Sequence, residues 1–259
     1  MNFLSKYASF ILIFLAFSSN LQEAQSQILN IEKARLDNDT LNKFLGNVNL
    51  GMTLKQRNTQ VFSFNSGLNL TQATKLHNYI LIGTSQLIKI EDSDVISDAS
   101  LHARANLMKR KSVSYELFVQ GQYDDARGLN YRFLTGGGTR FRLRYSDKIT
   151  LALGTGIMYE EEEWQVDDNF ALTQYAKSTN YLSAQNQFTD NFEINFIVYY
   201  QARFNHFFEP RVFSDINLNF SISKLLSFNS KFSTIYDAAP VVPIREWFYT
   251  FSNGLTIRF

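Results

Sequence analysis

Charged side chains recur at alternate positions within residues 129–164. Arg132 and Arg140 alternate with apolar residues in the first half of this stretch, and Glu160 and Glu162 do so in the second half. Alternate residues of a β-strand point to the same face of the sheet. The stretch therefore predicts two antiparallel strands that gather guanidinium and carboxylate groups on one face. These groups can form ion pairs and charge-assisted hydrogen bonds.

The same spacing occurs upstream, within residues 101–122, where polar side chains again fall on every second position. We expect all of these side chains to line one enclosed polar face. The predicted network consists of His102, Arg104, Asn106, Glu116, Gln120, Gln122, Arg132, Arg140, Arg142, Glu160 and Glu162. Such a network is either a selectivity constriction or ligand site, or a set of ion pairs that fills and braces a narrow lumen.

Catalysis is the weaker interpretation of these residues. The chain contains three histidines, His77, His102 and His206. None lies two residues from a serine on the predicted apolar face, where a lipid hydrolase would need its nucleophile. We therefore predict no catalytic residue, and we keep an enzyme acting on lipid or lipopolysaccharide as the alternative.

Two acidic runs could suggest a cation site. The first is residues 37–39 (Asp-Asn-Asp), and the second is residues 160–163 together with Asp167 and Asp168. A calcium site needs about 6–8 oxygen ligands at defined spacing. We read both runs as solvated turns or loops, and we predict neither a metal ion nor a cofactor.

The elements that position these residues are strands. From Gly46 onward, segments with period-2 alternation follow one another without a domain break, and we expect about twelve of them in a transmembrane antiparallel up-and-down β-barrel. They lie near residues 46–55, 62–70, 76–90, 101–108, 113–120, 131–145, 149–164, 177–188, 191–205, 211–222, 226–236 and 247–259. The face assignment of segment 76–90 stays open, because both of its faces are apolar.

The connections alternate between short charged turns and more varied loops. Residues 165–176 and 237–246 are predicted to be long loops, and short turns on one rim with longer loops on the other are typical of outer-membrane barrels. Aromatic residues near the strand ends predict two interfacial girdles: Tyr131, Tyr159, Trp164, Tyr236, Trp247 and Tyr249 on the loop side, and Tyr115 and Tyr145 on the turn side.

Turn lengths predict the strand register. A three-residue turn at residues 146–148 would pair Tyr145 with Ile149 and Arg132 with Glu162. It would also set Arg142 opposite Ala152 and Arg140 opposite Gly154, so that bulky guanidinium groups lie over residues with small side chains. A three-residue turn at residues 109–111 would place Arg104 opposite Glu116.

Residues 1–26 are typical of a secretory signal peptide, with Lys6 in a positive region followed by the apolar run of residues 10–17. Residues 27–44 form a polar lead-in to the periplasm, and residues 45–259 form the barrel. The formal charge is +1, both with and without the signal peptide, which argues against nucleic acid as a partner. The chain has no cysteine, which excludes disulfides.

The last strand ends on the aromatic residue Phe259 after an alternating apolar row. Many outer-membrane barrels end in this way, and the similarity implies recognition of Phe259 by the barrel-assembly machinery. The other expected partners are outer-membrane lipid and lipopolysaccharide, and the oligomeric state is left open.

Several motifs resemble the YdiY-like family of salt-induced outer-membrane proteins, a family of unknown function, in its Bacteroidetes-type form. The similar motifs are His102-x-Arg104-x-Asn106, Glu116-x-Phe118-x-Gln120-x-Gln122, Arg132-x-Leu134-x-Gly136-x-Gly138-x-Arg140, Met158-Tyr159-Glu160-x-Glu162, and the ending with Tyr236-Asp237, Pro240, Pro243, Gly254-Leu255 and Phe259. The resemblance extends from about Ile28 to the end of the chain. It implies an outer-membrane barrel and no established activity.

The sequence thus predicts a non-enzymatic barrel in the outer membrane of a Gram-negative bacterium. Two roles are open: a narrow passive pore, or a structural barrel with a polar, Arg/Glu-lined lumen.

One prediction concerns assembly. Replacing Phe259 with Asp, or deleting it, should remove the recognition signal and leave the protein in the periplasm. Fractionation and heat-modifiable migration on gels measure the inserted barrel. Normal amounts of inserted barrel in either variant would contradict the prediction.

Overall fold

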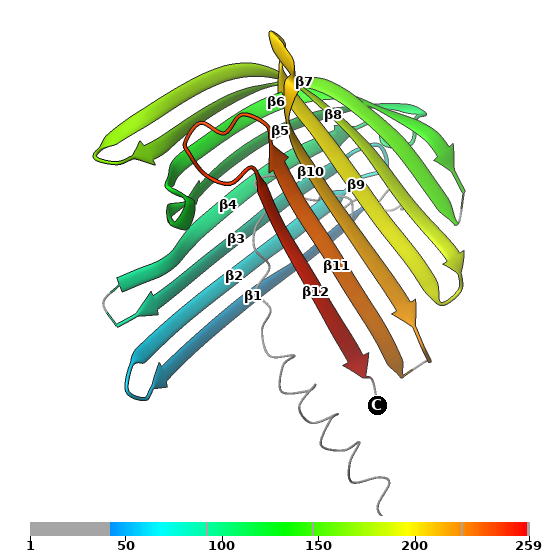
Figure 1. Ribbon diagram of the computed structural model, residues 1–259. Helices are drawn as coiled ribbons and strands as arrows, with labels where there is room; N and C mark the ends of the chain where they lie inside the picture. Colours follow the sequence, from blue (N-terminus) through cyan, green and yellow to red (C-terminus); the bar gives the residue numbers. More distant parts are fainter. Residues whose placement is uncertain (1–41, 92, 147, 224, 258–259) are drawn as a thin grey trace, which may run out of the picture.

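Twelve β-strands make up the computed structural model, which describes residues 42–91, 93–146, 148–223 and 225–257 (Figure 1). The strands are β1 (Lys43–Gln56), β2 (Gln60–Ala73), β3 (Asn78–Ile90), β4 (Ser93–Leu107), β5 (Val113–Asp124), β6 (Leu129–Tyr145), β7 (Ile149–Val166), β8 (Asn169–Thr189), β9 (Phe192–Arg203), β10 (His206–Ser221), β11 (Leu226–Asp237) and β12 (Trp247–Ile257). The predicted strand number and the all-β fold class are confirmed. No helix in the described residues is long and apolar enough to cross a membrane.

All strands belong to one antiparallel up-and-down sheet, in which each strand pairs with its neighbours in the sequence. The sheet is strongly curved, as Figure 1 shows. Within the described residues, β1 is paired with β2 and β12 with β11, and the sheet order contains no ladder between β1 and β12. These two edges carry many exposed apolar side chains, including Leu50 and Phe251.

The two faces of the sheet differ in chemistry as the alternation predicts. Phe141 and Ile157 lie on the outer face and are exposed, whereas Arg132, Arg140 and Glu162 lie on the inner face and are buried. Segment 76–90, whose facing the sequence leaves open, takes the same pattern in β3. Its inner face contains the buried Ile80, and its outer face contains the exposed Tyr79.

The register of the β6–β7 hairpin is largely as predicted. Arg132 pairs with Glu162, Arg140 with Gly154, and Arg142 with Ala152. The prediction is wrong at the turn, where Tyr145 pairs with Thr150 and not with Ile149. The cause is a bulge between Arg142 and Arg144, which adds one residue to β6.

The register between β4 and β5 differs from the prediction by two residues. Arg104 pairs with Phe118, and Glu116 pairs with Asn106. The connection is longer than three residues, because β4 ends at Leu107 and β5 begins at Val113. A shift of two residues keeps every side chain on its face, so the polar side chains still point inward.

The predicted long loop at residues 165–176 is wrong. Strands β7 and β8 continue their ladder to the pair Val166–Asn169, and only Asp167 and Asp168 form the turn. The segment contains neither proline nor glycine, so nothing in it interrupts the backbone hydrogen bonds. The polar residues Thr173 and Tyr175 are therefore strand residues of β8.

The predicted long connection after β11 is confirmed, and it folds inward. Residues 238–246 turn over the loop-side end of the sheet, as the red segment in Figure 1 shows. Val242 is buried there against Leu129 and Trp164. Trp164 is thus an inner-face residue that is 1% exposed, and its assignment to an outer aromatic girdle is wrong. Trp164 lies two residues from Glu162 and four from Glu160, and alternate residues of a strand share one face, so its side chain points inward.

Several predictions concern residues outside the described ranges. These are the signal peptide at residues 1–26, the run at residues 37–39, and the terminal Phe259. The lead-in of residues 27–44 lies mostly outside them, and its last two residues belong to β1.

Candidate functional site

The residues of the predicted polar network lie on the inner face. Nine are buried: His102, Arg104, Asn106, Glu116, Gln120, Arg132, Arg140, Glu160 and Glu162. Gln122 and Arg142 are half-buried. The network is divided between two groups of contacts, one toward the loop side and one toward the turn side of the sheet.

The loop-side group, here called the charge cluster, consists of Arg132, Glu160, Glu162, Lys177, Arg211 and Asp237. Strand β6 supplies Arg132, whose Nε lies 2.9 Å from Glu160 Oε2 and 3.0 Å from Glu162 Oε1. The ammonium group of Lys177, on β8, donates to Glu160 Oε1. One guanidinium and one ammonium group therefore hold the two carboxylates of β7.

Arg211 of β10 joins this cluster from across the inner face. Its Nη1 lies 2.5 Å from Glu162 Oε1, and its Nη2 lies 3.3 Å from Glu162 Oε2. The same guanidinium contacts Asp237 Oδ2 at 2.7 Å, at the point where the connection after β11 begins. Trp164 Nε1 donates to Glu162 Oε2 at 3.0 Å. Both oxygens of Glu162 are thus engaged.

Charge in the cluster is balanced. Arg132, Lys177 and Arg211 contribute three positive charges, and Glu160, Glu162 and Asp237 contribute three negative charges. The side chains of Glu160, Glu162 and Arg132 are at most 1% exposed. Buried charges are tolerated when they are paired and hydrogen-bonded. The cluster therefore has no net formal charge.

Lys177, Arg211 and Asp237 are members of the cluster that the sequence analysis did not select. Lys177 directly follows the segment assigned to a loop, and Arg211 lies in a strand far from the central hairpin in the sequence. Strand periodicity could have placed Lys177 on the inner face with Thr179 and Tyr181. Nothing in the sequence indicates that Arg211 reaches Glu162.

Glu116 organises the turn-side group. Its Oε2 accepts from Arg104 Nη1 at 3.1 Å and from the hydroxyl of Tyr181 at 2.8 Å. Arg140 Nη1 donates to Tyr181 Oη at 3.2 Å and to Ser183 Oγ at 3.3 Å. The predicted Arg104–Glu116 ion pair is therefore present as a diagonal contact, although the predicted register is wrong.

His102 is held in a chain of hydrogen bonds. Arg104 Nε donates to His102 Nε2 at 3.4 Å, so Nε2 is the acceptor and Nδ1 is the donor in the bond of 2.9 Å to Gln120 Oε1. Gln120 Nε2 donates to Gln122 Oε1 at 2.6 Å. Asn106 lies between Asn78 and Glu116 in the ladder. Both ring nitrogens of His102 are thus used in structural hydrogen bonds.

The acidic run at residues 160–163 does not converge on one point. Glu160 and Glu162 face inward, whereas Glu161 accepts from Tyr131 and Glu163 accepts from Asn130. Alternation along the strand separates neighbouring carboxylates onto opposite faces. The described residues contain no group of three or more metal-type ligands that could hold an ion.

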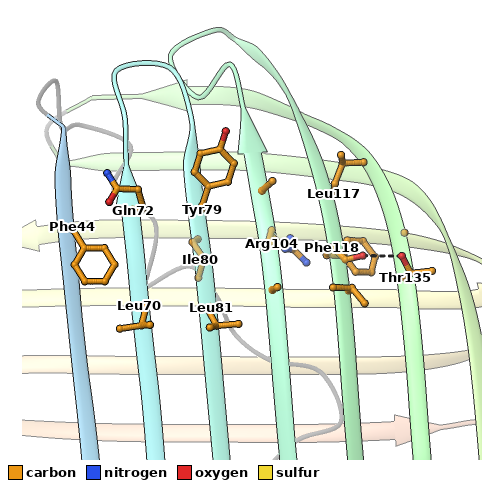
Figure 2. Close-up of a pocket in the computed structure, with 14 residues that line it drawn as sticks. Phe44, Leu70, Gln72, Tyr79, Ile80, Leu81, Arg104, Leu117, Phe118 and Thr135 are labelled. Atoms are coloured by element: carbon orange, nitrogen blue, oxygen red, sulfur yellow. Dashed lines mark hydrogen bonds between the residues drawn. The ribbon is translucent and has the colours of Figure 1, made fainter.

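A groove of about 680 Å³ lies on the outer face (Figure 2). Ala103 and Ala105 of β4 lie between the larger side chains of Tyr79 on β3 and Leu117 on β5. Phe44 on β1 lies at its far side, as Figure 2 shows. The groove arises because two alanines interrupt a row of large apolar residues.

Comparisons with known proteins identify a family. The model described as "Protein of unknown function, DUF481" matches residues 48–242. This match extends over more than half of the chain, so the chain belongs to the DUF481 family. The narrower YdiY-like and Bacteroidetes-type assignments stay predictions. No curated protein matches the chain.

Among solved structures, the chain is similar to one titled "NanC porin structure in rhombohedral crystal form". The identity is 8% and the TM-score is 0.43, and the similarity covers 76% of this chain and 94% of that chain.

A glycine substitution tests the packing around Glu116. A Cβ atom at Gly154 would overlap the ring of Tyr181. This ring lies over the glycine, where the sequence predicts the guanidinium group of Arg140. Gly154→Ala should therefore displace Tyr181 and lower the free energy of unfolding by about 1–3 kcal/mol. Urea unfolding of the refolded chain measures this change.

Gly121→Ala is the matched control, because a Cβ atom there meets nothing within 4 Å. It should leave stability unchanged or raise it slightly. Equal stability of the two variants would contradict the packing described for Tyr181.

Proposed function

We propose that this protein is a non-enzymatic, integral β-barrel of the Gram-negative outer membrane, whose interior is braced by ion pairs and leaves only a narrow passage for small solutes. The single observation that carries the proposal is the buried, charge-balanced cluster around Glu160 and Glu162. A wide diffusion channel would need the space that these side chains and the loop at residues 238–246 occupy.

The outer face supports the membrane part of the proposal. Leu101, Leu117, Phe133 and Ile157 are between 41% and 60% exposed. They lie on the neighbouring strands β4 to β7, so exposed apolar side chains extend across four strands of the outer face. Such a surface promotes aggregation in water, whereas lipid acyl chains cover it in a bilayer. Lipid and lipopolysaccharide are then the molecules around the barrel.

The inner face supports a brace more than a selectivity filter. A filter that favours one sign of ion needs an excess of the opposite charge along the path. The charge cluster has no such excess, and its carboxylates are bound on more than one side. We therefore propose that the passage runs beside the cluster and not through it.

Glu162→Gln separates the two roles. Removing this carboxylate charge leaves Arg132 and Arg211 with one fewer counter-charge in a buried site. Breaking a buried pair from one side costs up to about 3–5 kcal/mol, and hydration of the interior lowers that cost. We expect a lower thermal unfolding midpoint and little change in single-channel conductance or reversal potential in planar bilayers.

Glu163→Gln is the control, because Glu163 is the neighbouring residue of the same strand and lies on the other face, where it contacts Asn130. It should behave as the wild type in both measurements. Suppose that Glu162→Gln has normal stability and that its reversal potential moves toward anion preference. That result would show that the cluster is a selectivity filter and not a structural brace. A large conductance of the wild type would contradict the narrow interior.

A further inference from the structure

The groove on the outer face follows β4 near the turn-side end of the sheet (Figure 2). Ala103 and Ala105 form its floor, and each pairs with a larger residue on both neighbouring strands. These flanking residues on β3 and β5 are Tyr79, Leu81, Leu117 and Val119. The groove therefore presents hydrocarbon on its floor and on both of its walls.

Polar groups lie at one end of this groove. Gln72 on β2 and Tyr79 on β3 are partners in the ladder, directly before its last pair at the β2–β3 turn. Figure 2 shows the amide of Gln72 and the hydroxyl of Tyr79 on the side of that turn, with Leu70 and Leu81 on the other side. The groove thus changes from hydrocarbon to hydrogen-bonding groups toward the turn side.

Basic residues occupy the two connections beyond this polar end. The β2–β3 turn contains Lys75, and neither connection contains an acidic residue. The β4–β5 connection contains Lys109, Arg110 and Lys111. Lys109 is buried and its Nζ donates to Asn78 Oδ1 at 2.9 Å, whereas the other three side chains are exposed. This part of the turn-side rim therefore carries three exposed positive charges.

A phospholipid has the same kinds of group in the same order: apolar acyl chains, ester carbonyls that accept hydrogen bonds, and a phosphate. The amide of Gln72 and the hydroxyl of Tyr79 can donate to ester carbonyls. Basic residues beside a bilayer attract anionic headgroups. A second copy of the chain fits less well, because two inserted barrels that met at this groove would bring their basic turns side by side.

We propose that this groove is a binding site for one anionic phospholipid. An acyl chain lies along Ala103 and Ala105, and the exposed cations of the two connections attract the phosphate and the headgroup. The inference deepens the proposed function and rests on it, because the outer face meets lipid only in an inserted barrel. Short turns of such barrels face the periplasm, so the lipid belongs to the periplasmic leaflet.

Lipid binding by the full chain, refolded in detergent, tests the proposal. Native mass spectrometry reports bound lipid during titration with anionic phosphatidylglycerol or with zwitterionic phosphatidylcholine of the same acyl chains. We expect one phosphatidylglycerol molecule per chain. It should bind at least about tenfold more tightly than phosphatidylcholine, since each basic residue beside a lipid surface contributes about fivefold to the binding of an anionic lipid.

A triple variant tests the basic rim. Lys75→Gln, Arg110→Gln and Lys111→Gln together remove the three exposed charges beside the groove. The variant should bind the two phospholipids with equal affinity, and its affinity for phosphatidylcholine should match that of the wild type.

The matched control removes three exposed charges from the loop side of the sheet, with Lys55→Gln, Arg57→Gln and Arg245→Gln. It should keep the preference of the wild type for phosphatidylglycerol. Heat-modifiable migration on gels confirms that each variant is folded.

Ala103→Phe tests the groove itself. The phenyl ring would fill the floor between Leu81 and Val119, and phosphatidylglycerol should no longer bind at concentrations that saturate the wild type. Ala99→Phe is the matched control, because Ala99 lies on the same strand and face, four residues toward the loop side and outside the groove. It should bind phosphatidylglycerol as the wild type does.

Four results would overturn the proposal: no phosphatidylglycerol on the folded wild type, equal binding of the two phospholipids by the wild type, unchanged binding by the triple variant or by Ala103→Phe, or a dimer of the chain in place of the lipid complex. Tighter binding of lipid A, which belongs to the opposite leaflet, would also overturn it.

The titration uses the folded chain in detergent and needs neither conductance nor the charge cluster. Failure of phosphatidylglycerol binding is therefore distinct from failure of the proposed function, which the bilayer recordings and the stability of Glu162→Gln address.

Discussion

The contact between Arg211 and Glu162 is the interaction on which the rest of the inner face depends. It joins β10 to β7 over the two strands that lie between them in the sheet. Arg132 extends the contact to β6, and Asp237 extends it to the start of the connection after β11. Backbone ladders link only adjacent strands, so these side chains tie separated strands together at the loop-side end of the inner face, as Tyr181 and Glu116 do toward the turn side.

This cluster also positions what lies around it. Asp237 is held by Arg211, and the connection that follows then brings Val242 onto Leu129 and Trp164. The indole of Trp164 in turn donates to Glu162. The ion pairs and the apolar contact thus support each other. Buried polar networks of this kind, when every member is hydrogen-bonded, rigidify the structure around them.

Much of this arrangement was predictable from the sequence, because alternation in a strand determines which face a side chain occupies. That is why the Arg104–Glu116 pair is present despite a register error of two residues, which leaves the face unchanged. Contacts between strands that are not neighbours follow from the curvature of the sheet, and one-dimensional patterns do not report curvature. For that reason Arg211 was not selected. Lys177 lies at the start of the strand predicted at residues 177–188, but the predicted loop at residues 165–176 leaves the register of that strand against Glu160 open.

A double-mutant cycle between Arg211 and Glu162 tests the central claim most directly. The free energy of unfolding in lipid vesicles is measured for the wild type, Arg211→Gln, Glu162→Gln and the double variant. The buried contact predicts a favourable coupling energy of about 1–3 kcal/mol, because each single change removes the partner of the other residue. A coupling energy near zero would show that the two side chains act independently, and it would contradict the bracing role that we propose for the cluster.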